Sequence, residues 1–223
     1  MPVGVIRSAQ LDAVVAAVLD RGAVPVFDGE TQADLDAVAE FALRLDRPVA
    51  VLAAGGLARS LGPLLGLPEH PPLFRAEADR VVVVVGSGSP IARQQADALR
   101  GTAVRAVVVA PGERPRLDGG DAVIMLDHRS AWDPSELDRA FELIAHEIGA
   151  LPGRTDLVLT GGETARRVLD GLGIERLWAE AALEDGVVLC TTDDGRAVVT
   201  KPGSFGGPQT LRGIVDHVKG IPT

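Results

Sequence analysis

The sequence has few aromatic residues, a single cysteine, no run of basic residues and no long hydrophobic segment. Phe, Trp and Tyr make up only 3% of the 223 residues, and Tyr does not occur. Hydrophobic residues nevertheless reach 46%, so the core must be aliphatic and rich in small side chains. Such a core is typical of parallel sheets covered by helices, and 24% charged residues is ordinary for a globular protein.

Each of these shortages excludes a class of protein. A net charge of −9 without a basic cluster argues against a nucleic-acid partner, which would need cations along a phosphate backbone. No apolar run reaches 18 residues, so no membrane span is predicted. Cys190 cannot form an internal disulfide, and the first ten residues do not resemble a signal peptide. We therefore expect a cytoplasmic location.

Short apolar runs alternate with helical stretches along most of the chain. This alternation predicts an α/β fold, with a doubly wound, mostly parallel sheet and helices on both faces. The last two strands should form a hairpin across Asp194 and Gly195. The predicted strands are Val3–Ile6, Val24–Phe27, Pro48–Ala53, Val81–Val85, Val104–Ala110, Ala122–Leu126, Asp156–Thr160, Val187–Thr192 and Arg196–Lys201. The predicted helices begin at Ser8, Thr31, Gly56, Pro90, Asp133 or Ser135, Glu163 and Thr210.

A break near residues 66–79 separates two parts of the chain. Here the hydrophobic period is lost, two prolines follow each other, and a charged stretch precedes the valine strand. We expect residues 1–70 to form a small, partial α/β lobe and residues 80–223 to form the main domain.

Three turns between a predicted strand and a predicted helix carry the candidate site residues. In open α/β sheets, ligands lie beyond the carboxyl ends of the strands. The first turn, residues 86–90, has two glycines, the hydroxyls of Ser87 and Ser89, and Pro90 in the first helical position. A helix N-terminus of this kind favours anions, although a plain tight turn explains the residues equally well.

The second turn, residues 160–164, has the sequence Thr-Gly-Gly-Glu-Thr. Gly161 and Gly162 allow a ligand to approach the backbone, Thr164 follows them, and Glu163 could accept from ligand hydroxyls or hold a metal ion through water. The alternative is a capping box between Thr160 and Glu163, and both roles are compatible.

The third turn, residues 201–208, combines three glycines with a lysine and a phenylalanine. Lys201 suits a phosphate, Gly203 and Gly206 free the backbone, and Phe205 suits the face of a base or sugar. Three such turns in one sheet favour a single nucleotide site over coincidence. No metal-ligand set is predicted, because His146-Glu147 lacks the second histidine of a zinc helix.

At these turns the sequence resembles the four-carbon acid sugar kinases, which phosphorylate tetronates or 3-oxo-tetronates with ATP. The matching segments are VVVVVGSGSPIARQQADAL, LVLTGGETARRVLDGLGI and VVTKPGSFGGPQTL. VFDGETQADLDAVAEFAL and AAGGLARSL resemble the closing section of the family's acid-sugar lobe. The resemblance implies that ATP, with Mg²⁺, binds at Ser89, at residues 161–164 and at Gly203 with its neighbours.

The family's Asp-Asp-x-Thr-Gly type motif, expected near the start of the acid-sugar lobe, does not occur in the sequence. We therefore expect residues 1–70 to be the remnant of that lobe, and catalysis to need a missing or separate lobe. A non-catalytic nucleotide-binding or regulatory module is the alternative. A dinucleotide-binding oxidoreductase fragment is weaker, because Ile91 occupies a glycine position of its motif and no ribose-binding acid follows the next strand. The aliphatic first 65 residues also predict a homo-oligomer.

Overall fold

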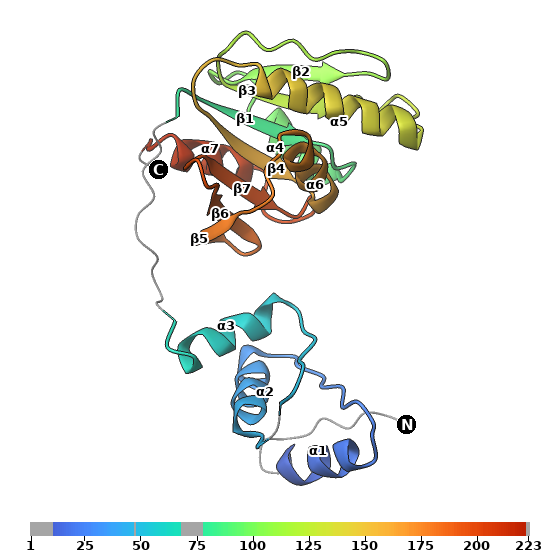
Figure 1. Ribbon diagram of the computed structural model, residues 1–223, viewed down its shortest axis with the longest axis vertical. Helices are drawn as coiled ribbons and strands as arrows, with labels where there is room; N and C mark the ends of the chain where they lie inside the picture. Colours follow the sequence, from blue (N-terminus) through green and yellow to red (C-terminus); the bar gives the residue numbers. More distant parts are fainter. Residues whose placement is uncertain (1–10, 47, 68–77, 222–223) are drawn as a thin grey trace. The chain divides into compact units, whose positions relative to one another are not determined.

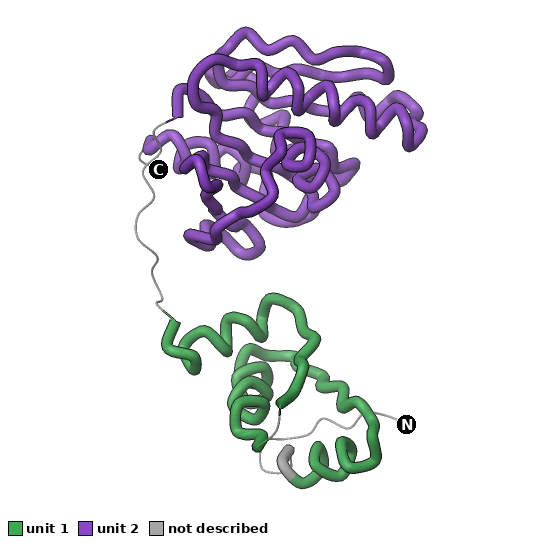
Figure 2. Tube along the Cα trace, viewed as in Figure 1, with its two compact units in different colours: residues 1–71 green, residues 72–223 purple. Residues whose placement is uncertain are grey.

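The chain forms two compact units, Met1–Pro71 and Pro72–Thr223, which we call unit 1 and unit 2 (Figure 2). The computed structural model describes residues 11–46, 48–67 and 78–221, so the predicted strand Val3–Ile6 and the predicted cap Ser8 lie outside the described residues. Within the described ranges, no helix is both long and apolar enough to cross a membrane.

Unit 1 contains three helices in its described part: α1 (Leu11–Asp20), α2 (Gln32–Arg44) and α3 (Gly55–Leu64). The predicted N-cap of α2 is confirmed, since Thr31 and Asp34 form a capping box. Helix α3 packs against α2, where Gln32 Nε2 donates to Ser60 Oγ at 2.7 Å. A small core forms around Val15 and Phe41.

The two strands predicted between the helices of unit 1 are wrong. The segments Val24–Phe27 and Pro48–Ala53 have no strand conformation. Their apolar side chains are largely exposed, at 84% for Val24 and fully for Leu52. A strand forms only where another strand satisfies its backbone N–H and C=O groups, and the described residues of unit 1 provide no such partner.

Unit 2 is built on one seven-stranded sheet with the order β2-β3-β1-β4-β7-β6-β5 (Figure 1). Strands β2, β3, β1, β4 and β7 are parallel, and the predicted hairpin of β6 and β7 is confirmed. The strands are β1 (Arg80–Val85), β2 (Arg105–Val109), β3 (Ala122–Leu126), β4 (Thr155–Thr160), β5 (Trp178–Glu184), β6 (Val187–Thr191) and β7 (Ala197–Lys201).

Helices cover both faces of this sheet, which confirms the doubly wound fold. Alternate valines of β1 point to opposite faces, because successive side chains of a strand do so. Val81, Val83 and Val85 share one cluster with α4 (Pro90–Asp97) and α7 (Thr210–Val218). Val82 and Val84 share the other cluster with α5 (Pro134–Gly149) and α6 (Gly162–Gly171).

Strand β5 was not predicted from the sequence. Its residues, Trp-Ala-Glu-Ala-Ala-Leu-Glu, are mostly good helix formers without a clear alternation. The segment is nevertheless extended, because it pairs antiparallel with β6 at the edge of the sheet. Tertiary pairing therefore overrides local propensity here, and irregular register at two points of the ladder accompanies it.

We predict that Ile144→Ala destabilises unit 2 strongly. Ile144 is fully buried between α5 and the sheet, and truncating such a side chain costs about 2–5 kcal/mol of unfolding free energy. Ile221→Ala is the matched control, because Ile221 is 47% exposed and its truncation should change stability by less than about 0.5 kcal/mol. Urea unfolding of both variants measures the difference, and equal midpoints would contradict the described core.

Candidate functional site

The three predicted turns follow strands that are neighbours in the sheet. Val85, the last residue of β1, pairs in register with Thr160 at the end of β4, and Thr160 pairs with Lys201 at the end of β7. Their turns therefore leave the sheet side by side at its carboxyl edge. After β1 the chain adds β2 and β3 on one side of β1, whereas after β4 it adds β7 on the opposite side of the sheet. The point between β1 and β4 is therefore a topological switch point, where α/β sheets bind ligands.

The turns also touch one another. The Gly161 N–H donates to the carbonyl of Lys201 at 2.8 Å, which joins the second turn to the third. A Cβ atom added to Gly203 would lie 2.2 Å from Ser87 Oγ and 3.9 Å from Ser89 Cβ. A Cβ on Gly161 would lie 3.8 Å from the Cβ of Ser87. The structure thus brings Ser87, Ser89, Gly161 and Gly203 together, as the sequence predicted, while their binding to a nucleotide stays a prediction.

The N-terminus of α6 is the candidate anion site at this edge. Gly161 is its N-cap residue, with φ of 102°, and Gly162 begins the helix. No side chain caps the helix, so the amides of its first turn remain available for an anion. Only glycine adopts the Gly161 conformation without strain.

The capping box considered for the second turn does not form. The N-cap is Gly161 rather than Thr160, whose hydroxyl is buried and has no partner among the described residues. Glu163 is largely exposed and accepts from Arg167 Nε at 2.7 Å. Thr164 is buried, and a Cβ on Gly86 would lie 2.4 Å from its hydroxyl, which explains the glycine after β1.

The first turn is held by its own serine. The Ser89 N–H donates to Ser87 Oγ at 3.2 Å, and Pro90 takes the first helical position of α4, as predicted. The proline has no N–H to offer a ligand, so the amides of α6 present the better anion site.

Lys201 is buried at the end of β7, with 3% of its surface exposed. Its Nζ donates to the carbonyl of Pro202 at 2.8 Å. Burial lowers the pKa of this ammonium group, against a smaller opposing effect of Glu184. An anion bound nearby would favour the charged form, so Lys201 remains a predicted phosphate ligand.

Phe205 and Gly206 have packing roles that the sequence did not reveal. A Cβ on Gly186, in the turn between β5 and β6, would lie 2.6 Å from the Phe205 ring, so the ring packs on this hairpin. The ring is still 45% exposed. Gly206 has φ of 82° and lies against Thr210, whose hydroxyl accepts from the Gly207 N–H at 3.0 Å.

Sequence reasoning missed Gln95, which fixes the third turn from α4. This side chain is fully buried, and its Nε2 donates to the carbonyls of Phe205 at 2.9 Å and Gly207 at 2.8 Å. The available signal was its helical spacing with Ala92, Ala96 and Leu99, which places a polar residue in a buried stripe. Gln95 therefore ties the helix after the first turn to the third turn.

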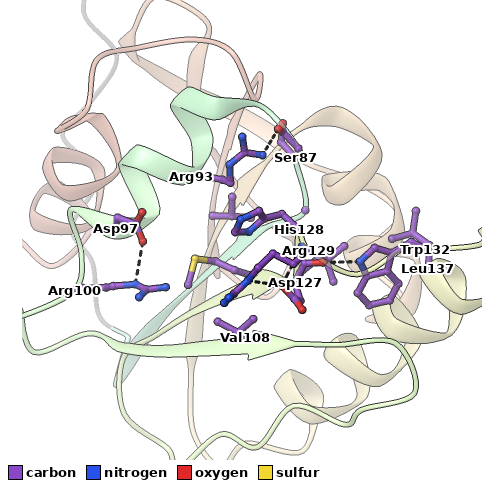
Figure 3. A pocket seen from close by; sticks show the side chains of 15 residues that line it. Ser87, Arg93, Asp97, Arg100, Val108, Asp127, His128, Arg129, Trp132 and Leu137 are labelled. Atoms are coloured by element: carbon purple, nitrogen blue, oxygen red, sulfur yellow. Dashed lines mark hydrogen bonds and ion pairs between the residues drawn. The ribbon is translucent and has the colours of Figure 1, made fainter.

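A cavity of about 280 Å³ lies beside the first turn, toward β3 and β2 (Figure 3). Asp127, directly after β3, lies on its wall and was taken from the sequence neither as a ligand nor as a base. Its carboxylate accepts from the Arg129 N–H at 3.1 Å and from Ser130 Oγ at 2.9 Å. The lining residues are Val85, Gly86, Ser87, Gly88, Arg93, Asp97, Arg100, Val108, Met125, Leu126, Asp127, His128, Arg129, Trp132 and Leu137.

Metal binding by side chains alone finds no support in the part of the chain that the structure describes. There, no three His, Cys, Asp or Glu side chains are grouped so that they could hold an ion.

We predict that Gly203→Ala forces the first and third turns apart. The new methyl group would overlap the Ser87 side chain, and overpacking of this kind costs about 1–3 kcal/mol. Ser87→Gly should recover part of the loss in the double variant, since the two residues touch. Gly207→Ala is the control in the same turn, because its Cβ would meet nothing within 4 Å. Denaturant unfolding of the unmodified protein, the two single variants, the double variant and the control tests this, and additive effects of Gly203→Ala and Ser87→Gly would contradict the contact.

Residues 121–211 match the family described as the nucleotide-binding C-terminal domain. This range contains the second and third turns, and the first turn precedes it. The chain is 34% identical over 217 residues to a D-threonate kinase from Cupriavidus necator, in a match that covers 83% of this chain and 51% of that protein. The chain thus spans about half the length of this curated relative.

Two solved structures resemble the fold. A domain of unknown function from Bordetella bronchiseptica, a domain-swapped dimer with bound citrate, is 26% identical, with a TM-score of 0.51, over 96% of this chain and 57% of that one. A putative tRNA synthase from Salmonella typhimurium LT2 is 18% identical, with a TM-score of 0.68, over 92% of this chain and 56% of that one, and supports the fold alone. The family match and the kinase relative together show that the chain carries the nucleotide-binding C-terminal domain of the four-carbon acid sugar kinases.

Proposed function

We propose that the chain is the ATP-binding portion of a kinase that phosphorylates a four-carbon acid sugar, a tetronate or 3-oxo-tetronate, together with an acid-sugar-binding lobe. The observation that carries the proposal is the meeting of three glycine-containing turns around the uncapped N-terminus of α6. Peptide amides at such a site bind phosphate groups without any cationic side chain. The 34% identity with a D-threonate kinase supports the choice of acceptor class.

The polyphosphate would lie on the amides of Gly162, Glu163 and Thr164, with Ser87, Ser89 and Gly203 on its other sides. Lys201 would neutralise part of the charge of the polyphosphate, because it ends β7, the strand next to β4. Mg²⁺ usually enters such sites on the phosphates and keeps several waters. The exposed carboxylate of Glu163, in the first turn of α6, is suited to hold one of these waters.

Residues 1–70 belong, in this proposal, to the acid-sugar-binding lobe. The support is the match with the D-threonate kinase, which covers more of the chain than unit 2 contains and so reaches into unit 1. Phosphoryl transfer requires the acceptor hydroxyl in line with the γ-phosphate, and positioning supplies most of the catalysis.

The described part of unit 1 also exposes several apolar side chains, which supports the predicted self-association: Val24, Val26, Val51, Leu52, Leu64 and Leu67.

Mg-ADP and Mg-ATP should raise the melting temperature of the protein. A ligand at a hundredfold excess over its Kd stabilises the folded state by about 2.7 kcal/mol, which corresponds to several degrees. Lys201→Met should weaken binding roughly tenfold or more, because it removes a charged donor from the phosphates. Lys219→Met is the control. Lys219 is the only other lysine in the sequence, and it pairs with Asp121, which precedes β3 and so lies at the end of that strand away from the candidate site. An unchanged melting temperature at millimolar nucleotide would contradict the proposed function.

Adding an acid-sugar-binding lobe of the family should produce ADP release from ATP when a tetronate is present. The acceptor hydroxyl then reaches the γ-phosphate, which the nucleotide-binding portion cannot arrange by itself. A coupled assay of ADP release with D-threonate, D-erythronate and their 3-oxo forms identifies the acceptor. Nucleotide binding without turnover in every combination would instead indicate a non-catalytic, regulatory module.

A further inference from the structure

The cavity beside the first turn is not lined by the α6 amides that would bind the phosphates. We propose that it holds the nucleoside part of the nucleotide, with Asp127 accepting hydrogen bonds from the ribose hydroxyls. This inference rests on the proposed function, since it places the remainder of the same ligand.

The position of the cavity is the first argument. Gly86, Ser87 and Gly88 form part of its wall and also belong to the first turn. A polyphosphate that extends from the N-terminus of α6 to Ser87 therefore ends at the mouth of the cavity. In Figure 3, Ser87 and Arg93 border the cavity on one side and Val108 borders it on the other. The group attached to the α-phosphate would enter it.

The order of the strands is the second argument. In dinucleotide-binding sheets, an acidic residue after the strand next to the glycine-rich strand binds the ribose. Here the strand next to β1 is β3, although β2 follows β1 in the sequence. Asp127 directly follows β3 and lies on the cavity wall. The chain thus has an acid at the place where the ribose binds in those sheets.

The carboxylate of Asp127 is ready to accept further hydrogen bonds. Its Oδ1 accepts from the Arg129 N–H and lies 3.7 Å from Nε of the Arg129 guanidinium, and its Oδ2 accepts from Ser130 Oγ, so a second lone pair on Oδ2 remains for a ribose hydroxyl. The hydrogen bonds from Arg129 and Ser130 also lower the pKa of Asp127, so the group is ionised at neutral pH. The side chain is 23% exposed, which leaves it accessible to a ligand.

The walls of the cavity fit a base better than an acid sugar. Val108, Met125, Leu126, Trp132 and Leu137 present apolar surface, which suits the faces of an aromatic ring and not a ligand with a polar group on every carbon. A volume of about 280 Å³ is close to the lower end of small-molecule sites, roughly 300–1,000 Å³, and suits one nucleoside.

The charges near the first turn suit the α-phosphate. Arg93 Nη1 donates to the carbonyl of Gly88 at 2.6 Å, which holds this guanidinium beside the turn. Of the other two arginines on the cavity wall, Arg100 is paired with Asp97 at 3.0 Å and Arg129 with Asp127 at 3.7 Å. Arg93 is thus the cation placed to meet the phosphate that carries the nucleoside.

Calorimetric titration with Mg-ADP and with magnesium tripolyphosphate separates the nucleoside from the phosphates. Asp127→Asn removes the charged acceptor, and Val108→Trp fills the cavity from β2. Each should weaken Mg-ADP binding at least tenfold, because Asp127→Asn loses strong hydrogen bonds to a charged group and Val108→Trp occupies the space of the nucleoside. Each should change tripolyphosphate binding less than twofold, because neither substitution alters the three turns. Asp170→Asn, on the exposed side of α6, is the control and should bind both ligands normally. Asp127→Asn should lose no affinity for 2′,3′-dideoxy-ADP.

Two results would overturn the nucleoside site while leaving the proposed function intact. One is Mg-ADP binding by Asp127→Asn and Val108→Trp with the affinity of the unmodified protein. The other is a loss of Mg-ADP affinity in Phe205→Ala alone, which would place the base over the third turn. An unmodified protein that binds neither ligand would instead refute the nucleotide site itself.

Discussion

The parallel register of β1, β4 and β7 is the constraint on which the candidate site depends. It places Val85, Thr160 and Lys201 in one row, so the turns that follow must leave the same edge of the sheet. Backbone hydrogen bonds set this row without help from any ligand. The first-turn amides of α6 have no side-chain cap at this edge, so an anion bound to them would require little reorganisation of the backbone. The proposed site would therefore be preorganised by the sheet rather than by charged side chains.

The same edge retains buried polar groups whose hydrogen-bonding capacity is only partly used. Gln95 Oε1 and Thr160 Oγ1 are buried without a partner among the described residues, and Lys201 is buried with one hydrogen bond. Leaving a polar atom unsatisfied costs about 1–3 kcal/mol, so a leucine in place of Gln95 would avoid this penalty. What leucine cannot do is donate to two carbonyls of the third turn. Gln95 thus leaves one buried oxygen unpaired at the position that holds the carbonyls of Phe205 and Gly207 in the third turn.

Local patterns predicted the elements of unit 2 well and those of unit 1 only in part. The buried valines of β1, the proline that opens α4 and the hairpin at Gly195 each carry a signal within a few residues. Strand β5 and the two segments of unit 1 that were predicted as strands do not, because partners elsewhere decide whether a segment becomes a strand. For the site, glycine content identified the three turns. Gln95 could not be assigned to the third turn, since its partners lie more than a hundred residues away.

The position of Asp127 shows why sequence order is a poor guide to which residues are neighbours at this edge. Along the chain, β2 follows β1, and Ala110 and Pro111 directly after β2 include no acid that could bind a ribose. In the sheet, however, β3 lies between β1 and β2, so the acid next to the first turn comes from the strand after the next one. The chain passes from β1 to β2 and only then returns to place β3 between them. The acid therefore lies next to the first turn in space, but at a different spacing in the sequence. A motif defined by spacing misses such an acid, whereas the strand order identifies it.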